Sequence, residues 1–168
     1  MNRSEYIHRT AIVEEGAKIG SSVKIGPFCY VGSNVVLKPG AILKNNVTVV
    51  GDTIVGDETT VFPFATVGEI PQDLKFSGEE TRLVIGKRNQ IREGVTINTG
   101  TSGGGGVTVV GNDCLLMTGS HVAHDAQIGN NVIMANQSAV AGHCVIAVSY
   151  THLPDHETTE ERVCPLMR

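Results

Sequence analysis

Aliphatic residues recur every six positions along most of this chain, and this period constrains the fold more than any other feature. The series comprises Ile7, Val13, Ile19, Ile25, Val31, Leu37, Leu43, Val49, Val55, Val61 and Val67, then Ile85, Ile91 and Ile97, and then, shifted by one residue, Val110, Leu116, Val122, Ile128, Met134, Val140 and Ile146. The apolar stripe of an α-helix repeats at about 3.6 residues, so the period excludes an amphipathic helix. It is typical of a short strand followed by a tight corner.

A second column of small or narrow side chains lies four residues after the aliphatic one, as at Ala11 and Ala17. Three six-residue units form a triangular coil of about 18 residues, and coils stack at the strand spacing of about 4.8 Å. The sequence therefore predicts an all-β fold, a parallel β-helix with a narrow interior. Cys29, Cys114 and Cys144 fall in the small column, so we interpret them as interior residues without a redox role.

The composition agrees with a narrow interior and excludes several functions. The 168 residues include 20 Gly, no Trp and only seven Tyr and Phe together, which is too few large rings for an ordinary globular core. A net charge of −4 indicates no nucleic-acid partner. No apolar run reaches the ~20 residues of a transmembrane segment. Met1–Thr10 also lacks the apolar run of a secretory signal, so we expect a cytoplasmic location.

Two segments interrupt the repeat and are predicted to leave the coil as excursion loops. In the first, at about 69–83, Asp73 and Glu79 stand where the series expects aliphatic residues. The interval containing them has the length of one full coil, so the phase of the repeat survives. The second, at about 98–109, contains the run Gly103–Gly106 but lacks the Lys-Ser/Thr end of a phosphate-binding loop. We expect it to be flexible and to lie near a site, because long loops on rigid scaffolds often carry function.

Three of the six histidines, His121, His124 and His143, cluster near the end of the repeat. Residues one coil apart stack on neighbouring coils, which predicts Asp125 beneath His143 and His124 beneath Gly142. This stacking sets a candidate general base next to a backbone N–H donor. The histidine cluster has two other interpretations at this point. The histidines could be polar residues scattered on the surface of the coil, or they could form a three-histidine zinc site.

Several motifs resemble one family of hexapeptide-repeat enzymes. His121–Asp125 (HVAHD), Gly142-His143, Gln72–Lys75 (QDLK) and Ile91–Ile97 (IREGVTI) are similar to segments of the UDP-N-acetylglucosamine O-acyltransferases that start lipid A biosynthesis. The resemblance covers residues 1 to about 146, with the loops in register. Known hexapeptide helices wind left-handed, so the resemblance implies a left-handed parallel β-helix.

The resemblance implies an acyl transfer without a metal or cofactor. A 3-hydroxyacyl chain would pass from acyl carrier protein to the 3-hydroxyl of the glucosamine in UDP-N-acetylglucosamine. By resemblance, His124 is the general base and Gly142 supplies its N–H to the oxyanion. Asp125 is a further catalytic candidate, but it can orient His124 only near a corner, because adjacent strand residues point to opposite faces.

Substrate-binding roles follow from the same motifs. Gln72 and Asp73 resemble sugar contacts and Lys75 resembles a contact to the acyl donor, while His121 and His143 would position the sugar and acyl groups. Sites in this family form between neighbouring subunits of a homotrimer. The resemblance therefore implies that the first loop reaches the histidines of another chain.

The sequence leaves the acceptor and the function open to more than one interpretation. Asn98 stands where many relatives have histidine, and some relatives acylate a 3-amino sugar, which leaves the acceptor as a hydroxyl or an amine. The chain could also be another hexapeptide-repeat acyltransferase or an inactive β-helix scaffold. Hexapeptide proteins that resemble carbonic anhydrases hold zinc with a close H-x4-H pair, whereas His121 and His124 are spaced H-x2-H. We therefore expect no catalytic metal.

The hexad series stops at Ile146, because His152 is not aliphatic and Tyr150 stands in the small column. Relatives carry more coils here and then a helical domain that helps to bind nucleotide and acyl carrier protein. We therefore interpret residues 1–146 as the β-helix domain and 147–168 as a foreign or frameshifted tail. An uncapped last coil exposes backbone and apolar groups, so we expect the chain as written to aggregate and to have little acyltransferase activity.

Overall fold

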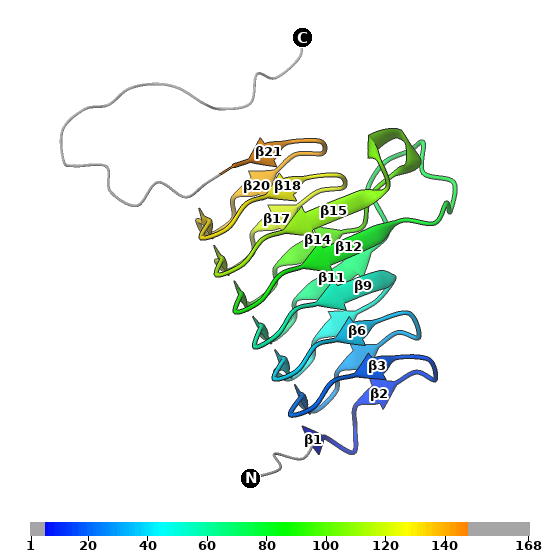
Figure 1. Ribbon diagram of the computed structural model, residues 1–168, viewed down its shortest axis with the longest axis vertical. Helices are drawn as coiled ribbons and strands as arrows, with labels where there is room; N and C mark the ends of the chain where they lie inside the picture. The colour runs from blue at the N-terminus through cyan, green and yellow to red at the C-terminus, as the bar shows by residue number, and fades with distance from the viewer. Residues whose placement is uncertain (1–5, 148–168) are drawn as a thin grey trace, which may run out of the picture.

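The computed structural model describes residues 6–147, which form a triangular prism of three parallel sheets (Figure 1). The strands are β1 (Tyr6–Ile7), β2 (Ile12–Val13), β3 (Lys18–Ile19), β4 (Lys24–Ile25), β5 (Tyr30–Val31), β6 (Val36–Leu37), β7 (Ile42–Leu43), β8 (Thr48–Val49), β9 (Asp52–Val55), β10 (Thr60–Val61), β11 (Thr66–Glu69), β12 (Arg82–Ile85), β13 (Gln90–Ile91), β14 (Thr96–Asn98), β15 (Val107–Val110), β16 (Leu115–Leu116), β17 (His121–Val122), β18 (Gln127–Ile128), β19 (Ile133–Met134), β20 (Ala139–Val140) and β21 (Val145–Ile146). A short 3-10 turn, η1 (Ser102–Gly104), lies between β14 and β15. The predicted left-handed parallel β-helix is confirmed. The predicted tail, 147–168, falls outside the described residues except for Ala147.

Successive strands belong to sheets A, B and C in turn, starting with β1 in A, β2 in B and β3 in C. Each strand pairs in parallel with the strand three places further along the chain, so that Tyr6 lies opposite Lys24 on the next coil. The aliphatic series points inward, and Ile25, Val61 and Ile97 are each 0% exposed. One buried aliphatic residue per side is therefore what holds the coils together.

Both excursion loops leave the edge at which sheet B passes into sheet C, which we call the B–C edge (upper right in Figure 1). The first loop, residues 70–81, joins β11 to β12, and the second, residues 99–106, joins β14 to β15. The next two corners on this edge join β17 to β18 and β20 to β21. The loops and the histidine-bearing corners thus occupy successive coils of one edge.

The strand register shows how the loops are inserted. Thr60 pairs with Gln90 across the first loop and Thr96 pairs with His121 across the second, so both intervals are longer than that of a regular coil. The interval from Val67 to Ile85 has the length of a full coil, but Val67 lies in sheet B and Ile85 in the next sheet, C. The interval is therefore one side of the prism lengthened by the insertion 70–81. An insertion at a corner leaves the ladder intact, because the strands on either side still pair with their neighbours.

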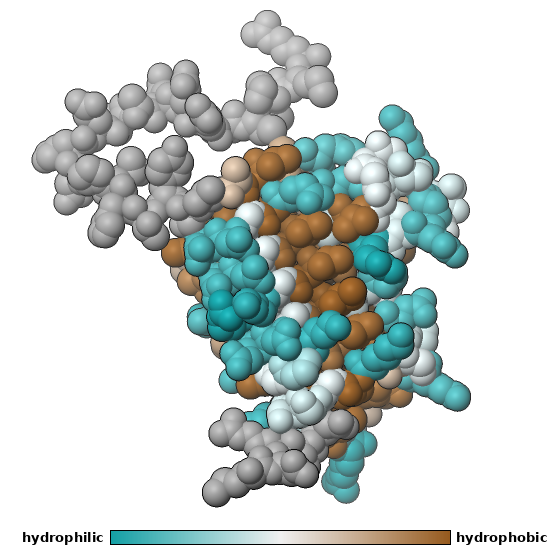
Figure 2. Space-filling model, in the orientation of Figure 1, coloured by the Kyte–Doolittle hydropathy of each residue, from teal (hydrophilic) through white to brown (hydrophobic). Residues whose placement is uncertain are grey.

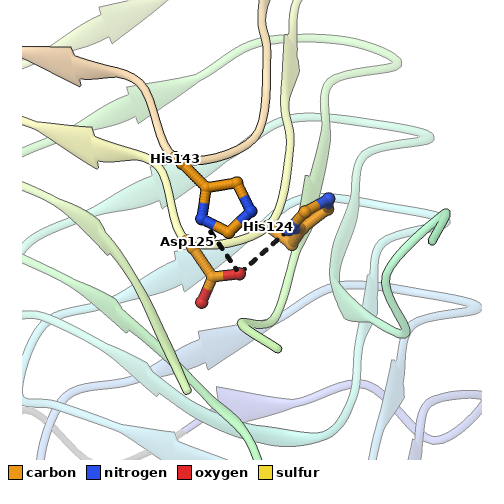
Figure 3. A group of neighbouring side chains, drawn as sticks. All are labelled: His124, Asp125 and His143. Atoms are coloured by element: carbon orange, nitrogen blue, oxygen red, sulfur yellow. Dashed lines mark hydrogen bonds and ion pairs between the residues drawn. The ribbon is translucent and has the colours of Figure 1, made fainter. Parts of the chain in front are cut away.

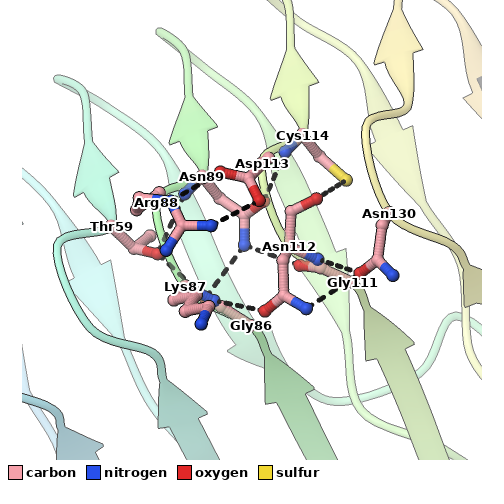
Figure 4. Close-up of polar contacts among 10 residues, drawn as sticks. All are labelled: Thr59, Gly86, Lys87, Arg88, Asn89, Gly111, Asn112, Asp113, Cys114 and Asn130. Carbon is pink, nitrogen blue, oxygen red and sulfur yellow. Dashed lines mark hydrogen bonds and ion pairs between the residues drawn. The ribbon is translucent and has the colours of Figure 1, made fainter.

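The edge between sheets C and A contains a buried polar network instead of an apolar corner (Figure 4). Asn89 is 1% exposed, and its Nδ2 donates to the carbonyls of Gly86 and Gly111 at 2.9 Å and 2.8 Å. Its Oδ1 accepts the N–H of Cys114 at 2.7 Å. One side chain therefore bonds three backbone groups on its own coil and the next. The carbonyl of Gly86 also accepts the hydroxyl of Thr59, whereas the other two groups would otherwise be buried without partners.

The outer face of sheet C carries an apolar stripe (Figure 2). Its middle strands present Val36, Ile54, Val84 and Val109 outward, all half-buried. The middle strands of sheet B present threonines at the corresponding positions, so the stripe distinguishes one face of the prism. No helix among residues 6–147 has the length and apolarity needed to span a membrane.

We predict that Asn89→Ala lowers the free energy of unfolding by about 2 kcal/mol or more, because it leaves the buried carbonyl of Gly111 and the buried N–H of Cys114 unpaired. Asn130→Ala is the matched control, since Asn130 is exposed and also accepts backbone and side-chain bonds from Asn112. We expect the control to cost under about 1 kcal/mol. Guanidinium denaturation followed by circular dichroism measures both, and equal losses would contradict the assigned role of Asn89.

Candidate active site

The histidine-bearing corners of the B–C edge stack as expected. His124 and Asp125 form the corner between β17 and β18, and Gly142 and His143 form the next corner along the edge, between β20 and β21. The N–H of His143 donates to the carbonyl of His124 at 3.1 Å, which links the two corners. Asp125 and His143 both have positive φ, 58° and 62°, the left-handed conformation that turns the chain at many corners of this prism.

His124 and Asp125 form a hydrogen-bonded pair (Figure 3). His124 Nδ1 lies 2.9 Å from Asp125 Oδ2, and the two side chains are 15% and 1% exposed. Both residues lie at a corner, which is the condition under which Asp125 can orient His124. An ionised carboxylate only accepts hydrogen bonds, so Nδ1 carries the ring proton and Nε2 keeps its lone pair.

The carboxylate of Asp125 is held ionised despite its burial. Burial raises the pKa of Asp125, but hydrogen bonds from the hydroxyl and N–H of Thr101 and from His124 outweigh it, and the net pKa lies below the ordinary value. The distances from Thr101 are 2.6 Å for the hydroxyl and 3.0 Å for the N–H. Asp125 therefore offers His124 a fixed negative charge at neutral pH.

Gly142 allows the ring of His124 to lie against the next corner. A Cβ at Gly142 would fall 2.7 Å from Cε1 and 2.8 Å from Nε2 of His124, too close for any side chain to fit. The amide of Gly142 donates no hydrogen bond to another residue of the described chain. The ring of the candidate base thus packs against a corner whose amide N–H has no partner among residues 6–147, and such an N–H can serve as an oxyanion donor.

The other two histidines of the cluster are His143, on the next corner of the edge, and His121, on the strand that precedes His124. His143 is 56% exposed, its Nδ1 is 3.9 Å from Asp125 Oδ2, and its ring meets that of His124 edge-on at a centroid distance of 5.0 Å. His121 lies on the outer face of sheet B, with Nδ1 2.7 Å from Thr96 Oγ1. Burial lowers the pKa of His121, a hydrogen bond with the backbone of Thr96 opposes this, and the nearby His124 lowers it further, so the net pKa lies below the ordinary value.

His124, Asp125 and His143 also offer ligand atoms within 4.8 Å of one another, which raises the possibility of a metal site. The chemistry of the donor set argues against a resident ion. Asp125 Oδ2 already accepts bonds from Thr101 and His124, and binding an ion there would displace the Nδ1 proton of His124. The cluster fits a hydrogen-bonded base better than a coordination site.

The first loop does not reach this cluster within one chain. Gln72 and Lys75 are exposed, and Asp73 Oδ1 accepts the N–H of Lys75 at 3.0 Å. None of these three side chains has a hydrogen bond or ion pair with the described histidines. Asn98 is 4% exposed and donates to the carbonyls of Glu69 and Ile70 at the base of the loop.

Sequence reasoning missed the residues that connect the two loops to the site. Glu79 Oε1 accepts the N–H and hydroxyl of Ser102 at 3.2 Å and 3.1 Å, and its Oε2 accepts the N–H of Ser77 at 2.8 Å. These bonds, led by that from Ser77, lower the pKa of Glu79 to about 2. Asp125 likewise depends on Thr101. The available signals were the acidic break in the aliphatic series and the Thr-Ser pair before the glycines.

We predict that Gly142→Ala displaces the imidazole of His124 while the coil stays folded. The backbone of Gly142 has no positive φ, and the clash is with a side-chain ring, so the ring can move without unfolding the chain. Gly103→Ala is the control, because a Cβ there meets nothing within 4 Å. Nitrogen-15 NMR of the histidine side chains should show a shifted His124 only in Gly142→Ala. An unmoved signal would contradict this packing.

We predict that the stability of the chain falls on acidification below about pH 4.5. The folded pKa of Glu79 is below its ordinary value, so its contribution is complete above the unfolded pKa and is lost as the pH falls towards 2. Asp125 acts in the same direction. Glu79→Gln should flatten the fall of the thermal midpoint between pH 5 and pH 2, whereas the exposed neighbour Glu80→Gln should not. Parallel profiles for both variants would contradict the prediction.

The chain is similar to known proteins over most of its length. A family model for the C-terminal domain of GMPPB matches residues 1–102, and a model for the bacterial transferase hexapeptide (six repeats) matches residues 107–142. The chain is 49% identical to a solved UDP-N-acetylglucosamine acyltransferase (TM-score 0.82), 47% identical to LpxA from Bacteroides fragilis, a UDP-N-acetylglucosamine acyltransferase (TM-score 0.81), and 45% identical to LpxA from Acinetobacter baumannii (TM-score 0.82).

Each of these three matches covers 83% of this chain and 54% of the solved chain. The chain therefore spans about half the length of the proteins it matches. Over 83% of its length it is similar to solved UDP-N-acetylglucosamine acyltransferases. The chain belongs to the family described by the model of the GMPPB C-terminal domain.

Proposed function

We propose that this chain transfers a 3-hydroxyacyl group from acyl carrier protein to the 3-hydroxyl of UDP-N-acetylglucosamine, the first step of lipid A biosynthesis. The observation that carries the proposal is the His124–Asp125 pair packed against Gly142, whose amide has no partner among residues 6–147. The solved relatives are UDP-N-acetylglucosamine acyltransferases, which supports UDP-N-acetylglucosamine as the acceptor. The donor follows from the family resemblance.

His124 acts as the general base. Its Nε2 takes the proton of the sugar 3-hydroxyl as the oxygen attacks the thioester carbonyl, and Asp125 stabilises the imidazolium that forms. The N–H of Gly142 donates to the oxyanion of the tetrahedral intermediate. Collapse of the intermediate breaks the C–S bond and keeps the new C–O bond. The imidazolium then returns the proton to the leaving thiolate, and neither a covalent enzyme intermediate nor a metal takes part.

The substrate contacts come from a neighbouring subunit in this proposal. Gln72, Asp73 and Lys75 are on an accessible loop and make no bond to the described histidine cluster of their own chain, which is what a contribution in trans requires. His121 and His143 border the base and position the sugar and acyl groups. The apolar stripe of sheet C adjoins the B–C edge and supplies a face that a homotrimer would cover (Figure 2).

We predict that His124→Ala lowers the rate of acyl transfer by about 100-fold or more, because the reaction loses its general base. The matched control is His8→Ala. His8 follows β1, at the opposite end of the prism, and its side chain forms a hydrogen bond with that of Thr10. Both variants should keep the thermal midpoint and the oligomeric state, measured by light scattering. Chelators should leave the turnover unchanged, whereas activity that depends on stoichiometric zinc would overturn the metal-free mechanism.

The assay is run on the 168-residue chain and on a chimera that continues after Ile146 into the C-terminal half of the Bacteroides fragilis relative. Transfer of acyl groups from acyl carrier protein to UDP-N-acetylglucosamine by the chimera supports the proposal. Full turnover in His124→Ala would remove His124 from its role. A chimera that binds neither substrate would favour an inactive scaffold.

A further inference from the structure

Thr101, in the second loop, is the main hydrogen-bond donor to the carboxylate of Asp125. Its N–H donates to Oδ1 at 3.0 Å and lies 3.1 Å from Oδ2, and its hydroxyl donates to Oδ2 at 2.6 Å. Oδ2 is also the oxygen bonded to His124 Nδ1. Thr101 and Asp125 are buried, at 5% and 4% exposure. Short charge-assisted bonds of this kind hold a carboxylate in one orientation.

The glycines of the second loop bring Thr101 to this position. The N–H groups of Gly104 and Gly106 donate to the carbonyl of Thr101 at 3.0 Å and 2.8 Å, which closes the loop on itself. A Cβ at Gly104 would overlap the carboxylate of Asp125, so the loop backbone rests directly on this group. At Gly104 the missing side chain therefore permits close packing against the site.

The remaining supports of Asp125 cannot replace Thr101. The N–H of Asp125 donates to Thr108 Oγ1 at 2.8 Å, which anchors the backbone of the corner but not the carboxylate. His124 is the group to be oriented, and His143 at 3.9 Å is too distant for a hydrogen bond. Without the hydroxyl of Thr101, Oδ2 would keep His124 and the longer contact to the N–H as its partners.

We propose that Thr101 is a positioning residue: its hydroxyl fixes the carboxylate of Asp125, which fixes the tautomer and ring orientation of His124. The effect on turnover rests on the proposed acyl transfer, but the effect on His124 does not. Thr101 acts through Asp125 and touches neither the base nor the reacting atoms. Through Thr101, the second loop therefore favours the tautomer of the neutral His124 ring in which Nε2 has no proton. It also fixes the ring in its position against Gly142.

The decisive measurement is nitrogen-15 NMR of the histidine side chains in the 168-residue chain, with His124 assigned from the signal missing in His124→Ala. The wild type should show a protonated Nδ1 and a bare Nε2. Thr101→Val should raise the fraction of the opposite tautomer about threefold or more, because the carboxylate is no longer held. Thr101→Ser keeps the hydroxyl and should restore the wild-type spectrum.

Thr59→Val is the matched control for a lost buried hydroxyl. Thr59 is 0% exposed, donates to the carbonyl of Gly86 and accepts the N–H of Asn89 on the edge between sheets C and A (Figure 4). It should lower the thermal midpoint as Thr101→Val does but leave the His124 signals unchanged. If Thr101→Val does not fold, Thr101→Ala makes the same test without placing a methyl group against the carboxylate.

A wild-type His124 spectrum in both Thr101→Val and Thr101→Ala would overturn the proposal, and so would an equal change in Thr59→Val. In the active chimera, Thr101→Val should lower kcat about 10-fold with little change in KM, since the lost function is orientation and not substrate binding. A change in KM alone would also contradict it. Because the NMR measurement needs no turnover, failure of the acyl-transfer proposal is distinguishable from failure of this one.

Discussion

The parallel pairing of residues one coil apart is the constraint on which the rest of this structure depends. Each side of the prism contributes one buried aliphatic residue, and the ladder places each corner above an equivalent corner of the previous coil. Functional groups can therefore be aligned along an edge at about the strand spacing without any long-range folding of loops. The stack of Gly142 on His124 is one instance of this alignment.

The edges of the prism differ in the buried polar residues at their corners. At the edge between sheets C and A, Asn89 bonds backbone groups of successive coils and is structural. At the B–C edge, Asp125 receives bonds from the second loop and passes its orientation to His124. Both are buried polar groups with all their main bonds satisfied, which is the condition for rigidity in a polar network. The difference is that the B–C network ends on a side chain with a free nitrogen.

The two loops are linked to one another as well as to the site. Glu79 in the first loop accepts hydrogen bonds from Ser102 in the second loop. The adjacent residue, Thr101, donates hydrogen bonds to Asp125. The loop that carries the candidate substrate contacts Gln72 and Asp73 is therefore fastened to the loop that supports the base. Gly104 completes the arrangement, because only a residue without a side chain lets the loop backbone rest on the carboxylate.

The sequence by itself determined the coil and the stacked corners, because a strict period of six and pairing between successive coils convert chain position directly into spatial position. The stacking of His124 beneath Gly142 followed from their spacing of one coil. The family motifs indicated acyl transfer as the chemistry of the site. Between Val67 and Ile85 the spacing alone was misleading, because one side of the prism, lengthened by the insertion 70–81, has the length of a full coil.

Only the tertiary structure decided how Thr101 and Glu79 act, because both lie in segments without periodicity, where residue number does not specify a neighbour. Their bonds to Asp125 and Ser102 form only when the loops fold back on the edge of the prism, a matter of local backbone geometry that no repeat encodes.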